Sequence, residues 1–275
     1  MDAEPATWDD VIAQPGGAAD FTIAYGQNRD QFGELRLPDH PGPHPIVMLI
    51  HGGCWLPEFN LVHIRPLAEA ITRLGLATWT IEYRRPAEAQ DGWPGTFEDV
   101  ASALDLLTSL ADAHDLDIDR ITLMGHSAGG QLALWLAARP SFGVSHPLFS
   151  PHPLAINRVL ALAPIADMVT YGHSEGSCPA GARRVMGGAP ETHPGRYRAV
   201  SPLSNLALDV QVDVVHALND SIVPVTQSET YVGRVNESGG QATLYRLPPP
   251  AGHFDVLISQ GPVWKLLHQL LLRTP

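Results

Sequence analysis

The chain has 275 residues, of which 44% are hydrophobic and 17% are charged, so it is long and apolar enough to bury a sizeable core. Its 17 lysines and arginines are outnumbered by 29 acidic residues, which gives a formal charge of −12. Proteins that bind duplex nucleic acid need the opposite sign, so no nucleic-acid partner is expected.

Targeting segments and cysteine usage point to a soluble protein. Residues 1–5 (MDAEP) are acidic and lack an apolar stretch, and no run approaches the roughly 20 apolar residues that a bilayer span needs. The two cysteines, Cys54 and Cys178, are too few for a disulfide framework and have no CxxC spacing. We therefore expect a cytoplasmic protein without a membrane partner, in which both thiols are free.

The predicted elements alternate along the chain. The 25 glycines and 25 prolines are scattered between short apolar runs, which is typical of many elements joined by turns. Two β-rich runs at the start predict an antiparallel hairpin, and the continuously apolar run 46–50 predicts a strand buried on both faces. The predicted strands are 20–25, 31–37, 46–50, 76–83, 120–124, 158–162, 210–218 and 242–247. The predicted helices are 60–74, 95–113, 128–138, 224–238 and 262–273.

This order predicts an α/β fold. Strands that alternate with helices of ten or more residues form a mainly parallel sheet with helices on both faces. We expect a single domain over residues 1–275. The segment 164–208 interrupts the alternation, because it is rich in Gly, Pro, Arg and Ser, has a weak helical pattern and is longer than an ordinary connection. We interpret it as a short insertion that caps a site.

A candidate nucleophile follows the predicted strand 120–124. Residues 125–130 (GHSAGG) lead from that strand into a helix, which is the context that a G-x-S-x-G elbow requires. A sharp turn at Ser127 needs small residues two positions before and after it, and the helix N-terminus favours negative charge there. A plain structural turn is the alternative. A phosphate-binding loop is excluded because Gln131 stands where its lysine would be.

A serine nucleophile needs a base and an orienting acid downstream, in the order Ser, acid, His. His253 lies in the loop between the last predicted strand and the last predicted helix, and Asp220 directly follows the strand 210–218. Both therefore fall at the same carboxyl edge of the sheet as Ser127, where open parallel sheets bind ligands. An N-cap for Asp220 and a surface loop for His253 are the simpler alternatives. The rival acids are Asp167, Asp255 and Asp213, the last ranked lowest because it lies inside a strand.

An oxyanion hole is predicted after the buried strand 46–50. The glycines of residues 51–55 (HGGCW) let the backbone turn the N–H groups of Gly53 and Cys54 toward the site, and the Ala128 N–H completes the set. A Gly-Gly pair after a strand is otherwise a simple turn. We interpret His51 as a structural residue that holds this loop by hydrogen bonding.

Side chains near these motifs are candidates for contact with a substrate. They are Trp55, Leu56, His126, Met168 and Phe254. Trp55 is equally compatible with core packing. Arg183 and Arg184 in the insertion are candidates for carboxylate recognition, although adjacent arginines usually form a solvated face. No H-E-x-x-H motif occurs, so neither a metal nor another cofactor is expected.

Taken together, these motifs resemble the α/β-hydrolase superfamily, within the branch of hormone-sensitive-lipase-like esterases and kynurenine formamidases. The resemblance covers residues 20–273 and rests on HGGCW at 51–55, GHSAGG at 125–130, Asp220 in an N-D-x-x-V-P context and His-Phe-Asp at 253–255. Residues 81–85 (IEYRR) also look like the D-Y-R strand end of the esterases, with Glu in place of Asp. Cys54 replaces the aromatic residue that is typical of kynurenine formamidases.

The resemblance implies a serine hydrolase that acts on a small-molecule ester or amide. Ser127 would attack the carbonyl, His253 would take its proton and Asp220 would orient the histidine. The open side of Gly53 favours a short acyl group. Hydrolysis of N-formylkynurenine is the alternative activity, and a ligand-binding protein on an inactive hydrolase scaffold is the alternative from another class.

Overall fold

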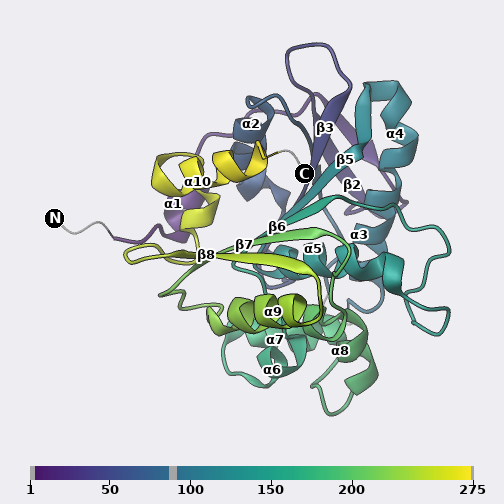
Figure 1. The fold of residues 1–275 in the computed structure, drawn as a ribbon, viewed down its shortest axis with the longest axis vertical. Coiled ribbons are helices and arrows are strands. Elements are labelled where there is room, and N and C mark those ends of the chain that lie inside the picture. The colour runs from purple at the N-terminus through teal and green to yellow at the C-terminus, as the bar shows by residue number, and fades with distance from the viewer. Residues whose placement is uncertain (1–3, 87–91, 274–275) are drawn as a thin grey trace.

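The computed structural model describes residues 4–86 and 92–273, which fold around one eight-stranded sheet (Figure 1). The strand order is β1-β2-β4-β3-β5-β6-β7-β8. The strands are β1 (Phe21–Ala24), β2 (Phe32–Arg36), β3 (His44–Ile50), β4 (Ala77–Ile81), β5 (Leu116–His126), β6 (Arg158–Leu162), β7 (Gln211–Ala217) and β8 (Gln241–Leu247). The hairpin β1-β2 is antiparallel, as is the pairing of β2 with β4, and all other pairings are parallel. This arrangement confirms the predicted hairpin and the mainly parallel sheet.

Helices cover both faces of the sheet (Figure 1). The first layer consists of α1 (Trp8–Ile12), α2 (Arg65–Thr72) and α10 (Gly261–Leu271), and the second of α3 (Gly95–Asp105), α4 (Leu107–His114), α5 (Ala128–Ala138) and α9 (Thr226–Glu237). Side chains of β3 alternate between the two cores: Met48 and Ile50 belong to one, Val47 and Leu49 to the other. This burial on both faces explains why the strand is continuously apolar.

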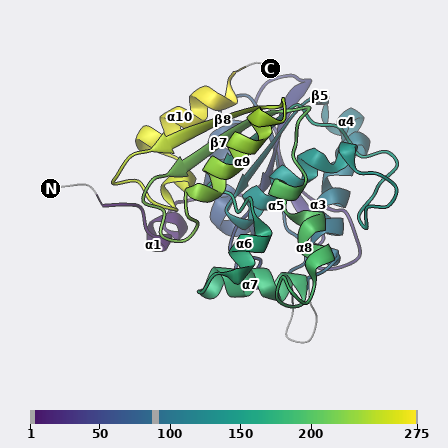
Figure 2. The same ribbon diagram turned by 60° about the horizontal axis from the view of Figure 1, so that its bottom comes forward.

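Three helices occupy the predicted insertion: α6 (Met168–His173), α7 (Ser177–Met186) and α8 (Pro194–Val200). They lie together beside α5 and α9 (Figure 2). Met168, Val185 and Tyr197, one from each helix, are fully buried in the same core as α5. The segment is therefore a packed helical layer, more regular than its sequence pattern indicates.

Several element boundaries differ from the predictions. The stretch predicted as one helix over 60–74 begins with a 3-10 turn (Leu61–Ile64) before α2, and the stretch 95–113 is divided into α3 and α4. The helix α1 was not predicted, because five residues are too few to show a helical period. It is stabilised by a capping box between Thr7 and Asp10.

The prediction that both thiols are free is wrong. Cys54 and Cys178 form a disulfide, with their Cα atoms 4.8 Å apart. The two cysteines are 124 residues apart in the sequence, so only the packing of α7 against the loop after β3 brings them together. The cysteine count consequently gives no support to a reducing compartment.

Within the described ranges, no helix combines the length and the apolar character that a bilayer crossing requires.

Candidate active site

Ser127 stands on a strained turn between β5 and α5. Its φ of 55° and ψ of −116° lie outside the regions that side chains favour. The backbone holds it there, since the Ser127 N–H donates to the Leu162 carbonyl at 2.8 Å and its carbonyl accepts from Gln131 N–H at 3.1 Å. Such strain is on the order of 1–3 kcal/mol and persists only where the surroundings enforce it.

Steric crowding explains the glycines around Ser127. A Cβ on Gly125 would lie 2.1 Å from the carbonyl oxygen of Gly129, and a Cβ on Gly129 would lie 2.1 Å from that of Ile50. Both contacts are with backbone, which cannot move aside without shifting α5 or the sheet. The G-x-S-x-G spacing is thus a packing requirement of this turn.

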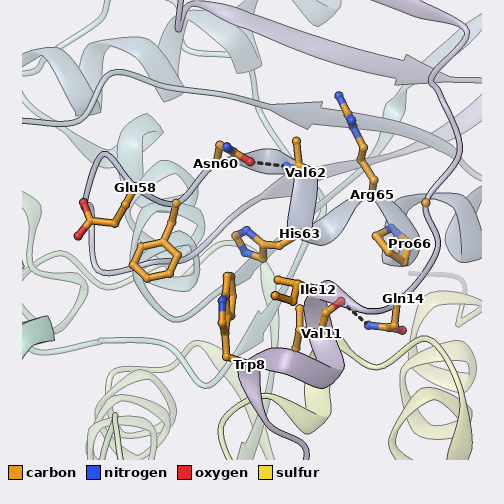
Figure 3. Close-up of a pocket in the computed structure, with 12 residues that line it drawn as sticks. Trp8, Val11, Ile12, Gln14, Glu58, Asn60, Val62, His63, Arg65 and Pro66 are labelled. Atoms are coloured by element: carbon orange, nitrogen blue, oxygen red, sulfur yellow. Dashed lines mark hydrogen bonds between the residues drawn. The ribbon is translucent and has the colours of Figure 1, made fainter.

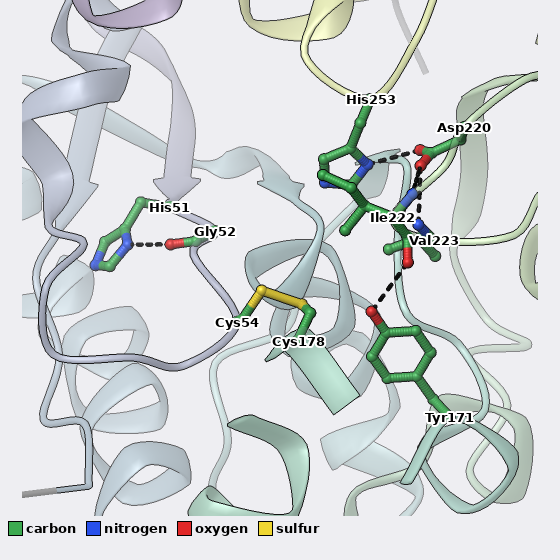
Figure 4. The surroundings of a disulfide bond; sticks show 9 residues. All are labelled: His51, Gly52, Cys54, Tyr171, Cys178, Asp220, Ile222, Val223 and His253. Carbon is green, nitrogen blue, oxygen red and sulfur yellow. Dashed lines mark hydrogen bonds and ion pairs between the residues drawn. A yellow bond between two sulfur atoms is a disulfide. The ribbon is translucent and has the colours of Figure 1, made fainter. Parts of the chain in front are cut away.

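Asp220 and His253 form a buried pair at the carboxyl edge of the sheet (Figure 4). His253 Nδ1 donates to Asp220 Oδ2 at 2.6 Å, and Asp220 Oδ1 accepts the backbone N–H groups of Ile222 and Val223 at 2.8 Å each. Because His253 Nδ1 carries the proton that it donates to the carboxylate, the other ring nitrogen of the neutral imidazole, Nε2, is an acceptor. The loop after β7 therefore fixes both the acid and the tautomer of the histidine.

A second histidine, missed by sequence reasoning, contacts the same carboxylate. His216, fully buried at the end of β7, places Nε2 3.3 Å from Asp220 Oδ2 and 2.9 Å from the Val223 carbonyl. Its Nδ1 lies 2.6 Å from Ser228 Oγ. Burial by itself raises the pKa of Asp220, but hydrogen bonds from His216 and His253 lower that pKa well below its usual value. Asp220 is therefore ionised throughout the neutral range.

His126 connects the serine turn to the loop that carries His253. His126, which precedes Ser127, has its ring centroid 4.5 Å from that of His253 and its Nε2 3.0 Å from the His253 carbonyl. Burial is the main cause that lowers the pKa of His126 well below its ordinary value, and the nearby His253 ring lowers that pKa further, so the His126 ring is neutral. Within the described part of the chain, the Ser127 hydroxyl makes no hydrogen bond, so Ser127 and His253 do not form a hydrogen-bonded pair in this structure.

The loop after β3 lies directly against Ser127. A Cβ on Gly52 would be 3.2 Å from the Cβ of Ser127. Beyond it the backbone adopts positive φ at three consecutive residues, Gly53 (106°), Cys54 (56°) and Trp55 (55°). The backbone N–H groups of Gly53, Cys54 and Ala128 donate no hydrogen bond to any other described residue. Because this loop contacts Ser127 through Gly52 and Ala128 follows Ser127 in the chain, the three unpaired N–H groups form a candidate oxyanion hole.

A buried polar network holds the strand end from which this loop departs. His51 Nδ1 donates to the Gly52 carbonyl at 2.7 Å, its Nε2 lies 2.9 Å from Glu82 Oε1, and its ring stacks on Tyr83. Arg85 also pairs with Glu82. Burial by itself raises the pKa of Glu82, but His51, Arg85 and the Leu61 N–H lower it to about 2. His51 thus holds the loop, as the sequence indicated.

The rival acids have other partners. Asp167 caps the N-terminus of α6, Asp213 binds Arg158 with its Oδ2, and Asp255 accepts the backbone N–H groups of Ala6 and Gly252. Each of these carboxylates is bound by groups other than the His253 ring. Asp220 is the acid that the fold brings to His253.

The candidate substrate contacts divide by burial. Trp55 and Met168 are fully buried members of the core, so in this structure they pack against other side chains and offer no surface to a ligand. Burial of Trp55 fits the alternative of core packing. Leu56 and Phe254 are partly exposed, and His126 is buried beside His253. Arg183 donates to the carbonyls of Gly172 and Ser174 and so joins α6 to α7.

A separate cavity of about 320 Å³ lies between α1 and the segment 58–66 (Figure 3). The Trp8 ring stands 5.1 Å from the rings of both Phe59 and His63 and 5.8 Å from that of Phe254. Burial, then the proximity of His51, lowers the pKa of His63 to about 3, which keeps it neutral. None of Ser127, Asp220 and His253 lines this cavity, so it adjoins the candidate site without being part of it. In the described ranges, no group of three or more His, Cys, Asp or Glu is placed to hold a metal ion.

Comparison with known proteins places this chain in a family. The model of the BD-FAE family matches residues 35–234, well over half of the chain. The chain belongs to the BD-FAE family. This family is part of the α/β-hydrolase superfamily, which confirms the superfamily that the motifs predict.

Individual relatives of this BD-FAE protein carry esterase names. It is 28% identical over 252 residues to a probable carboxylic ester hydrolase, LipM, of Mycobacterium tuberculosis, covering 87% of this chain and 57% of that protein. It is 25% identical over 253 residues to a probable isoprenylcysteine alpha-carbonyl methylesterase of Oryza sativa subsp. japonica, covering 86% of this chain and 58% of that protein. The chain thus spans a little over half the length of these curated relatives.

Solved structures share the fold of this BD-FAE protein. A truncated form of a carbohydrate esterase from gut microbiota superposes on this chain with a TM-score of 0.79 at 18% identity. The superposition covers 98% of each of the two chains. Esterase B from Lactobacillus rhamnosis gives a TM-score of 0.79 at 19% identity, covering 96% of this chain and 88% of its own. The predicted α/β-hydrolase fold is therefore confirmed.

Proposed function

We propose that this protein is a serine carboxylesterase that cleaves short-acyl esters through an acyl-enzyme intermediate. The observation that carries the proposal is the Asp220–His253 hydrogen bond of 2.6 Å at the sheet edge where the strained Ser127 lies. The esterase names of the relatives agree with this chemistry.

In the proposed mechanism, Ser127 Oγ attacks the ester carbonyl carbon while His253 Nε2 accepts the hydroxyl proton. Asp220 stabilises the imidazolium that forms. The N–H groups of Gly53, Cys54 and Ala128 bind the oxyanion, and each such donor contributes about 2.7–4 kcal/mol in comparable sites. His253 then protonates the departing alcohol, and a water molecule repeats the sequence to release the acid.

Gly53 does not have the open side expected from the sequence, because a Cβ there would lie 2.3 Å from the Phe59 Cβ. The packing of α7 supports a small acyl group instead. A Cβ on Gly181 of this helix would lie 2.2 Å from the Cys54 carbonyl oxygen, so the helix backbone closes directly on the oxyanion loop. We propose that α6–α8 act as a cap which limits the space beside Ser127. Leu56, Phe254 and His126 are the proposed substrate contacts.

A panel of 4-nitrophenyl esters from acetate to decanoate tests the function. We expect the highest kcat/KM for acetate to butyrate, labelling of Ser127 by a fluorophosphonate probe, and loss of turnover by at least 10³-fold in Ser127→Ala and His253→Ala. Retained hydrolysis in both variants would refute the mechanism.

The same panel separates the alternatives. Faster turnover of N-formylkynurenine than of an aryl acetate would identify a formamidase, for which the His-Phe-Asp segment at 253–255 is the supporting feature. Tight binding of an ester without turnover, together with an unreactive Ser127, would indicate a ligand-binding protein.

A further inference from the structure

The Cys54–Cys178 disulfide joins the candidate oxyanion loop to the helix that closes over it. Cys54 lies in the loop after β3, and Cys178 lies in the first turn of α7 (Figure 4). Cys178 is 4% exposed, and Cys54 is partly exposed. The bond therefore connects the main-chain group proposed to bind the oxyanion with a segment more than a hundred residues away.

The loop has a conformation that needs restraint. Cys54 and Trp55 both have positive φ without being glycine, an arrangement that side chains rarely adopt and that persists only where the surroundings enforce it. At the β3 end, the hydrogen bonds and stacking of His51 provide that restraint. At the far end, the loop meets α7 through the Gly181 backbone and the disulfide.

We propose that Cys178 is a positioning residue, which through its disulfide holds the Cys54 N–H in the donor position, so that a dithiol reductant lowers turnover. This inference rests on the proposed function. A thiolate of the dithiol attacks one sulfur of the bond, and the other cysteine leaves and takes a proton. The second thiol of the reductant then closes to a cyclic disulfide and releases the remaining cysteine, so that two electrons and two protons pass to Cys54 and Cys178.

The test compares 4-nitrophenyl acetate hydrolysis by the protein purified without reductant, by the same protein treated with dithiothreitol and desalted, and by Cys178→Ser. Complete removal of an oxyanion donor costs 10²–10³-fold in kcat. Because reduction only loosens the donor, we expect kcat to fall about tenfold in both modified forms with KM within threefold. The inhibition constant of a trifluoromethyl ketone, which forms an oxyanion on Ser127, should rise by the same factor.

Two controls separate this role from a merely structural one. Ser177→Ala changes an exposed residue beside Cys178; it should retain full activity and remain sensitive to dithiothreitol, whereas Cys178→Ser should be insensitive. Assays run well below each form's unfolding temperature. A lower unfolding temperature with unchanged kcat and unchanged ketone affinity would overturn the proposal. The proposal would also be overturned if Cys54 and Cys178 were free thiols in the purified protein and oxidised glutathione did not join them in a disulfide. Failure of the oxidised protein to hydrolyse any ester or to be labelled at Ser127 would instead refute the proposed function.

Discussion

Replacement of Asp220 by asparagine separates the proposed catalytic role of this side chain from its structural role. In the wild-type protein, Asp220 Oδ1 accepts hydrogen bonds from two backbone N–H groups, whereas Oδ2 accepts hydrogen bonds from the rings of His253 and His216. Asparagine keeps an oxygen for the two backbone donors and places an NH2 group opposite the histidines. His253 must then accept at Nδ1, so its proton moves to Nε2, which can no longer take a proton from Ser127.

The magnitude follows from this tautomer change. The equivalent substitution in serine proteases lowers kcat by about 10⁴-fold, which corresponds to about 5 kcal/mol in the activation barrier. The free energy of unfolding should fall by only about 2 kcal/mol, because the bond to His253 is kept in the reverse direction and the loop keeps its two backbone bonds, while the charge-assisted bond from His216 is lost. Asp220→Ala should be less stable than Asp220→Asn, since it also leaves the N–H groups of Ile222 and Val223 without their acceptor.

The assay is kcat for 4-nitrophenyl acetate at pH 7–8, with unfolding followed by urea titration. Asp167→Asn serves as the matched control, because Asp167 caps α6 and should leave kcat within twofold. If Asp220→Asn retains more than a tenth of wild-type kcat, the assignment of the acid is refuted. If Asp167→Asn instead loses activity, the acid is the rival carboxylate.

Three further predictions concern stability. Gly129→Ala should lower the free energy of unfolding by more than about 3 kcal/mol or prevent folding, because its Cβ would lie 2.1 Å from a backbone carbonyl oxygen. Gly233→Ala on α9 should raise the free energy of unfolding by about 0.5–1 kcal/mol, because its Cβ would enter open space. His63 has its pKa lowered from 6.5 to about 3; the unfolded chain therefore binds the extra proton, and stability that is complete above pH 6.5 falls as pH drops toward 3. In urea titrations from pH 6.5 to pH 3, His63→Gln should reduce this acid-induced loss of unfolding free energy, which we call the acid limb, by up to about 4 kcal/mol. Arg158→Met should cost about 3–5 kcal/mol, because it leaves the buried carboxylate of Asp213 without its partner.

Each of these has its own control or contrary outcome. Equal unfolding midpoints for the two glycine variants would contradict the packing argument. His152→Gln changes an exposed histidine and should leave the acid limb as steep as in wild type; an equally steep limb in the His63 variant would contradict the burial argument. Arg158→Met combined with Asp213→Leu should recover most of the loss, and a double variant no better than the single one would show that the ion pair is not the cause.

The sequence determined the architecture because its signals are local. The apolar run of β3 and the spacing of Gly125, Ser127 and Gly129 reflect contacts within a strand or a single turn, and each prediction agrees with the observed strand and turn. The hydrogen bond between Asp220 and His253 also agrees with their predicted positions, since the carboxyl ends of parallel strands meet at one edge. The fold and the meeting of Asp220 with His253 at one sheet edge therefore followed from the sequence.

Only the tertiary structure decided how distant segments meet. His216 carries no motif, and it reaches Asp220 because β7 ends beneath the loop that holds the carboxylate. Trp55 is adjacent to the candidate oxyanion donors in the sequence, yet the positive φ of the loop turns it into the core. Cys54 and Cys178 show no pairing signal, and their disulfide arises because α7 packs on the loop after β3. Local patterns specify turns and strands, whereas such contacts depend on the packing of the whole chain.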